Sequence, residues 1–119
     1  MNRADFSDAA LVLLGHGTTL DPQSSAPVYQ HAAELRRRNL FATVRDAFWK
    51  QEPNIRKVLD ELGEPRVFIV PLFISEGYFS EEAIPRELGF RKENEEGFPR
   101  MLRRGTQTFY YCQIGRAHV

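Results

Sequence analysis

Apolar and polar residues follow one another along the chain in a pattern that predicts strands and helices in turn. Apolar, β-branched and aromatic runs of strand length occupy residues 10–15, 41–49, 66–75 and 106–113. Apolar residues recur at helical spacing in residues 26–39 and 52–63, and a shorter helix is predicted over residues 80–89. The charged stretch from Arg91 to Gly105 is predicted to be a solvated loop or an exposed helix.

This alternation predicts an α/β fold. A crossover between parallel strands needs an intervening helix, so we expect a three-layer sandwich, with a central parallel sheet of about four strands and helices on both faces. Ligands bind outside the carboxyl ends of the strands in such sheets. Two predicted strands end in glycine-containing turns that carry ionisable groups and should share this edge: Gly15, His16 and Gly17, and Ser75, Glu76 and Gly77.

Composition limits the partners that the chain can have. The 119 residues fit one domain, and the 16 basic residues balance the 16 acidic ones, which gives no overall field for nucleic acid or an anionic membrane. The N-terminus lacks the long apolar core of a secretion signal, so a cytoplasmic protein is expected. The single cysteine, Cys112, excludes an intrachain disulfide and a thiolate zinc cluster made by this chain alone. Nitrogen and oxygen atoms would have to hold any metal.

Three histidines differ in what their surroundings predict. His16 lies between Gly15 and Gly17 at a strand end, where neutral imidazole can bind a metal or accept a proton near pH 7. The alternative is that His16 only bonds a neighbouring carbonyl and ends the strand. His31 lies beside two alanines in a predicted helix, which indicates a surface or half-buried structural role. His118 lies in the terminal tail and is assigned no role.

Other motifs narrow the chemistry. Glu76, Glu81 and Glu82 either deliver metal or transfer protons, or are first-turn carboxylates favoured by a helix dipole. No GxxxxGK[ST], GxGxxG or GxSxG motif follows a predicted strand, which disfavours nucleotide binding and serine hydrolysis of those kinds. A strand that ends in a histidine-glycine pair also resembles the histidine phosphatases, which makes a histidine-dependent phosphoryl-transfer enzyme a further alternative. Those enzymes have an arginine immediately before the histidine to bind the phosphate, whereas this chain has Gly15, which disfavours the alternative.

Three stretches together carry a family resemblance: "LVLLGHGTT", "FWKQEP" and "VFIVPLFISEGYFSEEAIPREL". From Leu11 to about Gln113 the chain resembles the sirohydrochlorin chelatases, or CbiX-like proteins. The resemblance implies a chelatase fold with a tetrapyrrole held above the strand ends. It implies a lyase that inserts a divalent metal, cobalt or iron, as a substrate in cobalamin or sirohaem biosynthesis, with no organic cofactor.

The resemblance also assigns residues. The family's first active-site histidine falls on His16, expected to bind metal and act in catalysis, with Glu76 as a second catalytic group. The neighbouring turn residues are expected to contact the substrate: Gly15, Gly17, Thr18, Ser75 and Gly77. Phe79 stands where the family has its second histidine, and phenyl neither binds metal nor accepts a proton. Therefore Glu76 takes over, or His16 acts with substrate groups, or the protein is a non-catalytic tetrapyrrole or metal carrier.

Domain boundaries follow from the same resemblance. Residues 1–113 are expected to form a CbiX-like chelatase domain that is truncated at its C-terminus. Residues 114–119, "IGRAHV", resemble a translated sequencing adapter and are expected to be a non-native tail. The native chain is expected to form a homodimer or to carry a second chelatase domain. Without the following segment, the strand at 106–113 is expected to have one poorly covered face.

Overall fold

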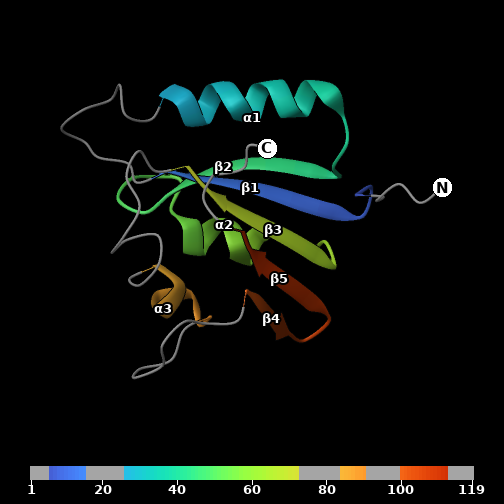
Figure 1. The fold of residues 1–119 in the computed structure, drawn as a ribbon, viewed down its shortest axis with the longest axis vertical. Helices are drawn as coiled ribbons and strands as arrows, with labels where there is room; N and C mark the ends of the chain where they lie inside the picture. Colours follow the sequence, from blue (N-terminus) through green and yellow to red (C-terminus); the bar gives the residue numbers. More distant parts are fainter. Residues whose placement is uncertain (1–5, 16–25, 73–83, 91–99, 113–119) are drawn as a thin grey trace.

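The computed structural model describes residues 6–15, 26–72, 84–90 and 100–112. Strands and helices alternate through most of this part of the chain (Figure 1). The elements are β1 (Ala9–Gly15), α1 (Ala26–Arg38), β2 (Thr43–Phe48), α2 (Ile55–Glu61), β3 (Arg66–Pro71), α3 (Ile84–Leu88), β4 (Met101–Arg104) and β5 (Gln107–Tyr111). The predicted α/β class is confirmed.

The strands form one five-stranded sheet in the order β2-β1-β3-β5-β4. The β1 strand pairs in parallel with β2 and β3, β3 pairs in parallel with β5, and only β4 is antiparallel to its neighbour. Every residue of β1 is buried. A strand covered on both faces has no solvent side, which is why its sequence is a continuous apolar run rather than an alternating one.

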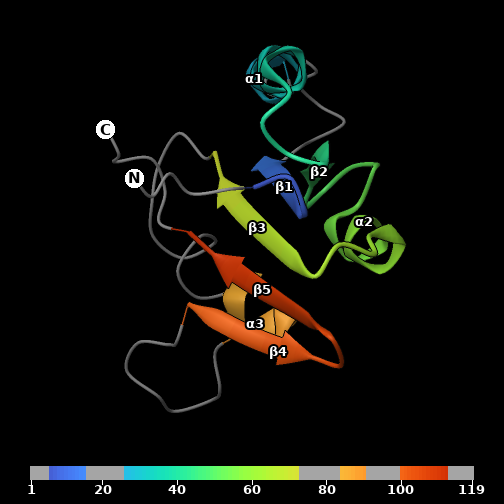
Figure 2. The ribbon, with the colours of Figure 1, turned by 90° about the vertical axis from the view of Figure 1, so that its right-hand side faces the viewer.

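Helices cover both faces of the sheet, as predicted (Figure 2). On one face, α1 packs Val28 and Ala32 against Leu11, Leu13 and other apolar residues of β1 and β2. On the other face, residues of α2 and α3 join one cluster that includes Val12, Ile69, Phe109 and Tyr111. Among the described residues, no helix is both long and apolar enough to cross a membrane.

The ends of the helices follow local sequence. The α1 helix ends in Arg36, Arg37 and Arg38, which suits the negative end of the helix dipole, and Asn39 then takes a left-handed backbone with φ 54°. The α2 helix is capped by Asn54, whose side chain accepts a hydrogen bond from the Arg56 N–H at 2.9 Å. The sequence placed the start of this helix earlier, near Pro53.

The prediction for residues 91–105 is wrong where the structure describes them. Met101 to Arg104 form β4, which makes an antiparallel hairpin with β5. Arg104 pairs with Gln107, so Gly105 and Thr106 form a two-residue turn, and Gly105 has a φ of 62°. Short hairpin turns require a positive φ at the first turn position, which glycine adopts without strain. The sequence did not indicate β4 because most of its residues are exposed and can be charged, so no apolar pattern marks the strand.

The two faces of β5 are covered differently. Phe109 and Tyr111 are buried in the cluster with α2 and α3, whereas Tyr110 on the opposite face is half-buried. The Tyr110 ring stacks on Phe68 of β3, with centroids 4.7 Å apart and planes 12° apart. Thr108 and Tyr110 are partly buried, so this face of β5 is less buried than the face that carries Phe109 and Tyr111.

Candidate functional site at the carboxyl edge of the sheet

The carboxyl ends of the four parallel strands lie along one edge of the sheet (Figure 1). Gly15 at the end of β1 is in register with Phe48 of β2, and Leu14 is in register with Pro71 of β3. Hydrogen bonds continue the pairing one residue further. The Trp49 N–H donates to the Gly15 carbonyl at 3.0 Å, and the Leu72 N–H donates to the Leu14 carbonyl at 2.7 Å. The ends of β1 and β3 are thus adjacent, at the shared edge that the sequence predicted for them.

The sheet order changes direction between β1 and β3. The chain goes from β1 to α1 and β2 on one side, and from β3 towards α3 and β5 on the other. The two helices that follow these neighbouring strands pack on opposite faces of the sheet. Connections that leave adjacent strands towards opposite faces open a crevice between them, and ligands of α/β proteins bind in that crevice. The topology therefore locates the candidate site at the carboxyl ends of β1 and β3.

Most of the residues assigned from sequence lie outside the described residues. This holds for His16, Gly17, Thr18, Ser75, Glu76 and Gly77, and also for Phe79, Glu81 and Glu82. Their roles stay predictions. The structure shows which strand each of these segments follows. His16 directly follows Gly15 at the end of β1, and the segment 73–83 follows Leu72 at the end of β3.

Gly15 is described, and it is buried where α1 meets the sheet. A Cβ atom at this position would lie 2.7 Å from Val28 Cγ2 and 3.1 Å from Phe48 Cε1, both shorter than an ordinary contact. The absence of a side chain thus lets α1 approach the end of β1. The structure gives Gly15 a packing function in addition to the substrate contact predicted for it.

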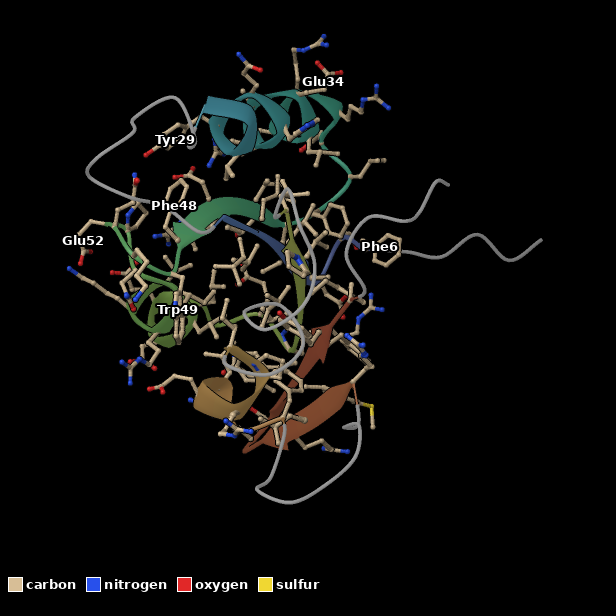
Figure 3. The ribbon with its side chains drawn as sticks, turned by 60° about the vertical axis from the view of Figure 1, so that its left-hand side comes forward. Phe6, Tyr29, Glu34, Phe48, Trp49 and Glu52 are labelled. Carbon is tan, nitrogen blue, oxygen red and sulfur yellow. The ribbon has the colours of Figure 1, made fainter. Side chains whose placement is uncertain are left out.

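The stretch "FWKQEP" contributed to the family resemblance, but no role was assigned from sequence to Phe48 and Trp49, the aromatic residues at the end of β2. Tyr29 of α1 packs its ring on Phe48, with centroids 5.4 Å apart, and Trp49 follows (Figure 3). The turn after β2 is held by a hydrogen bond from the Phe48 N–H to the Pro53 carbonyl at 2.9 Å. The signal available in the sequence was the cluster "FW" at a strand end, next to the predicted ligand-binding edge.

Two other candidate residues can be placed. His31 is exposed on α1, in line with the surface position expected for it. Cys112 follows β5 at the carboxyl edge and donates its backbone N–H to the Ile69 carbonyl at 2.8 Å. Burial raises the pKa of the Cys112 thiol, an effect that the positive charge of Arg100 opposes. Within residues 6–15, 26–72, 84–90 and 100–112, no three His, Cys, Asp or Glu side chains gather as metal ligands.

Comparison with known proteins decides the family. The family model described as CbiX matches residues 10–116, which is nearly the whole chain. The chain belongs to the CbiX family. The resemblance to CbiX-like proteins that the sequence motifs indicated is therefore confirmed for the family.

The chain is also similar to two proteins whose names include sirohydrochlorin cobaltochelatase. The chain is 57% identical over 79 residues to a Halobacterium salinarum protein named "Probable sirohydrochlorin cobaltochelatase". The aligned region covers 66% of this chain and 27% of that protein. It is 36% identical over 91 residues to a sirohydrochlorin cobaltochelatase of Methanocaldococcus jannaschii, covering 73% of this chain and 63% of that one. This CbiX-family chain thus spans less than two thirds of the length of these relatives.

A solved structure supports the fold of this CbiX-family chain. The protein DR2241 of Deinococcus radiodurans, described as multi-domain with structural similarity to chelatases, is 33% identical. The match has a TM-score of 0.77 and covers 89% of this chain and 25% of that one. A chelatase-like sandwich is the fold of this chain.

Proposed function

We propose that this chain is a chelatase domain that inserts a divalent metal ion into sirohydrochlorin or a closely related tetrapyrrole. The observation that carries the proposal is the change of direction of the sheet between β1 and β3, with His16 directly after β1. Membership of the CbiX family and relatives named as sirohydrochlorin cobaltochelatases support it.

The chemistry requires a group that handles protons and metal at one place. The macrocycle loses two pyrrolic protons while the incoming ion sheds its water. Neutral imidazole of His16 can accept one of these protons or bind the ion on its way to the macrocycle. The carboxylate of Glu76, at the second predicted turn, is proposed as the second group in proton transfer.

The remaining features of the proposal concern the metal, the partner and the location. Cobalt is the metal named for the relatives, and iron is the alternative. The metal enters as a substrate, and the chemistry needs no organic cofactor. We propose residues 1–113 as the chelatase domain, which works in the cytoplasm and pairs with a second chelatase domain or a second copy.

His16 can be tested against His31, another histidine in the same chain. The chain is mixed with sirohydrochlorin and Co²⁺, and metal insertion is followed by the absorbance of the macrocycle. Loss of a proton-accepting or metal-binding group should slow insertion about a hundredfold or more in His16→Ala. His31→Ala should insert metal at the wild-type rate, because His31 is exposed on α1. Equal rates in the wild type and His16→Ala would contradict the assignment.

The same measurement separates the enzyme from a carrier. Phe79 in place of a second histidine is the observation that favours a carrier. A carrier would shift the tetrapyrrole spectrum on binding and show no later spectrum of the metal complex. An enzyme would show both changes in sequence, with the second depending on the concentration of Co²⁺.

A further inference from the structure

Tyr29 is a large aromatic side chain that is held in place and yet open to solvent. Its exposed fraction is 43%. It lies in the first half of α1, the helix that packs against one face of the sheet. The ring contacts Phe48 at a centroid distance of 5.4 Å, with the planes tilted by 58°. Phe48 is itself fully buried, so the contact holds the Tyr29 ring against the core while part of the residue stays exposed to solvent.

The position of Tyr29 relates it to the candidate site. Phe48 is the last residue of β2 and is in register with Gly15, the last residue of β1. A hydrogen bond from the Trp49 N–H to the Gly15 carbonyl joins these strand ends. Figure 3 shows Tyr29 on the same side of the molecule as Phe48, Trp49 and Glu52. The Tyr29 ring thus lies at the carboxyl edge against the end of β2, and β2 is the neighbour of β1, the strand that leads to His16.

We infer that Tyr29 is a substrate-contacting residue whose ring forms an apolar wall of the tetrapyrrole site. This inference rests on the proposed function. A tetrapyrrole is a flat conjugated ring system, and aromatic side chains favour offset or edge contacts with such surfaces. Tyrosine offers a large contact area with few rotatable bonds, and the Phe48 contact already limits the motion of its ring. Binding therefore costs little further ordering at this position.

A purely structural role for Tyr29 makes a different prediction. If the ring only covered Phe48, its replacement would change stability and leave binding intact. Tyr29→Leu keeps an apolar contact with Phe48 and removes the aromatic ring. Tyr29→Phe keeps the ring and removes only the hydroxyl. Leu40→Ala is a matched control, because Leu40 is 55% exposed just beyond the opposite end of α1.

The test is a fluorescence and absorbance titration of the whole chain with metal-free sirohydrochlorin, with circular dichroism to check the fold. Tyr29→Leu should bind about fivefold more weakly than the wild type, the scale of one aromatic contact. Tyr29→Phe should restore binding to within about twofold, since the ring surface is kept. Leu40→Ala should bind like the wild type. In the insertion assay, Tyr29→Leu should raise KM and leave kcat nearly unchanged.

Each outcome decides something. If folded Tyr29→Leu binds as tightly as the wild type, the inference is wrong and the proposed function stands. If Leu40→Ala weakens binding as much as Tyr29→Leu, the effect is not specific to the carboxyl edge and the inference is again overturned. If the wild type binds no tetrapyrrole at all, the proposed function fails and the inference with it.

Discussion

Gly15 joins the packing of α1 to the start of the candidate site. It is buried at the end of β1, its carbonyl accepts a hydrogen bond from Trp49, and His16 is the next residue. From the sequence, the glycines beside His16 were expected to contact the substrate. The structure shows that Gly15 also leaves room for Val28 of α1, a residue distant in the sequence. A close contact of this kind cannot be predicted from local sequence.

The packing at Gly15 can be measured by adding one methyl group. Gly15→Ala should lower the free energy of unfolding by about 1–3 kcal/mol, because the new Cβ would lie 2.7 Å from Val28 Cγ2 and Val28 is fully buried. Urea unfolding provides the measurement. Combining Gly15→Ala with Val28→Ala should destabilise less than the sum of the two single changes, since the contact is then relieved.

Gly63→Ala is the control for this experiment. Gly63 lies just after α2 and has no atom within 4 Å of an added Cβ. Alanine there should change stability by less than about 1 kcal/mol, and in the stabilising direction, because it restricts the unfolded chain. Equal stabilities for Gly15→Ala and Gly63→Ala would show that α1 can move away from β1 without cost.

At the scale of elements, the hairpin of β4 and β5 shows where pattern reading fails. Its strand β4 has mostly exposed residues, so no apolar alternation indicates it. The turn between the strands is indicated more clearly, because a glycine followed by a small polar residue between strand-forming residues is typical of two-residue hairpins. Gly105 and Thr106 fit that signal. The hairpin was therefore predictable from its turn and not from its strand.

The backbone at Gly105 supports a second prediction. Gly105→Ala should lower the free energy of unfolding by about 1–2 kcal/mol, because a side chain disfavours the φ of 62° found there. No atom lies within 4 Å of the added Cβ, so the cost comes from the backbone alone. Gly105→Asn should cost less, since asparagine tolerates this conformation better. A thermal unfolding series would contradict this reasoning if alanine and asparagine were equally destabilising.

At the scale of the whole molecule, the order of the strands determines which backbone amides are best protected from hydrogen exchange. The β1 strand lies inside the sheet with a partner on each side and helices on both faces. The β4 strand lies at the edge with a single partner, and most of its residues are exposed. Opening of β1 therefore requires breaking the core, whereas β4 can open when only its pairing with β5 is broken.

Hydrogen exchange measures this difference directly. The β1 amides should exchange at a rate close to that of global unfolding and should be the slowest of the described strands. Amides of β4 should exchange faster by at least about tenfold, because local opening of an edge strand exposes little apolar surface. The measurement is exchange followed by mass spectrometry of peptides. Comparable protection in β1 and β4 would mean that the hairpin unfolds only with the core.

The sequence by itself determined the alternation of strands and helices, the α/β class, the apolar run that forms β1 and the family. Those properties depend on the spacing of apolar residues and on motifs between near neighbours, which are written in the chain in order. Only the tertiary structure decided the strand order, the antiparallel β4, the closeness of Gly15 to Val28 and the contact of Tyr29 with Phe48. These features depend on which residues, distant in the sequence, come into contact. Those contacts are determined only when all elements pack together into one close-packed core.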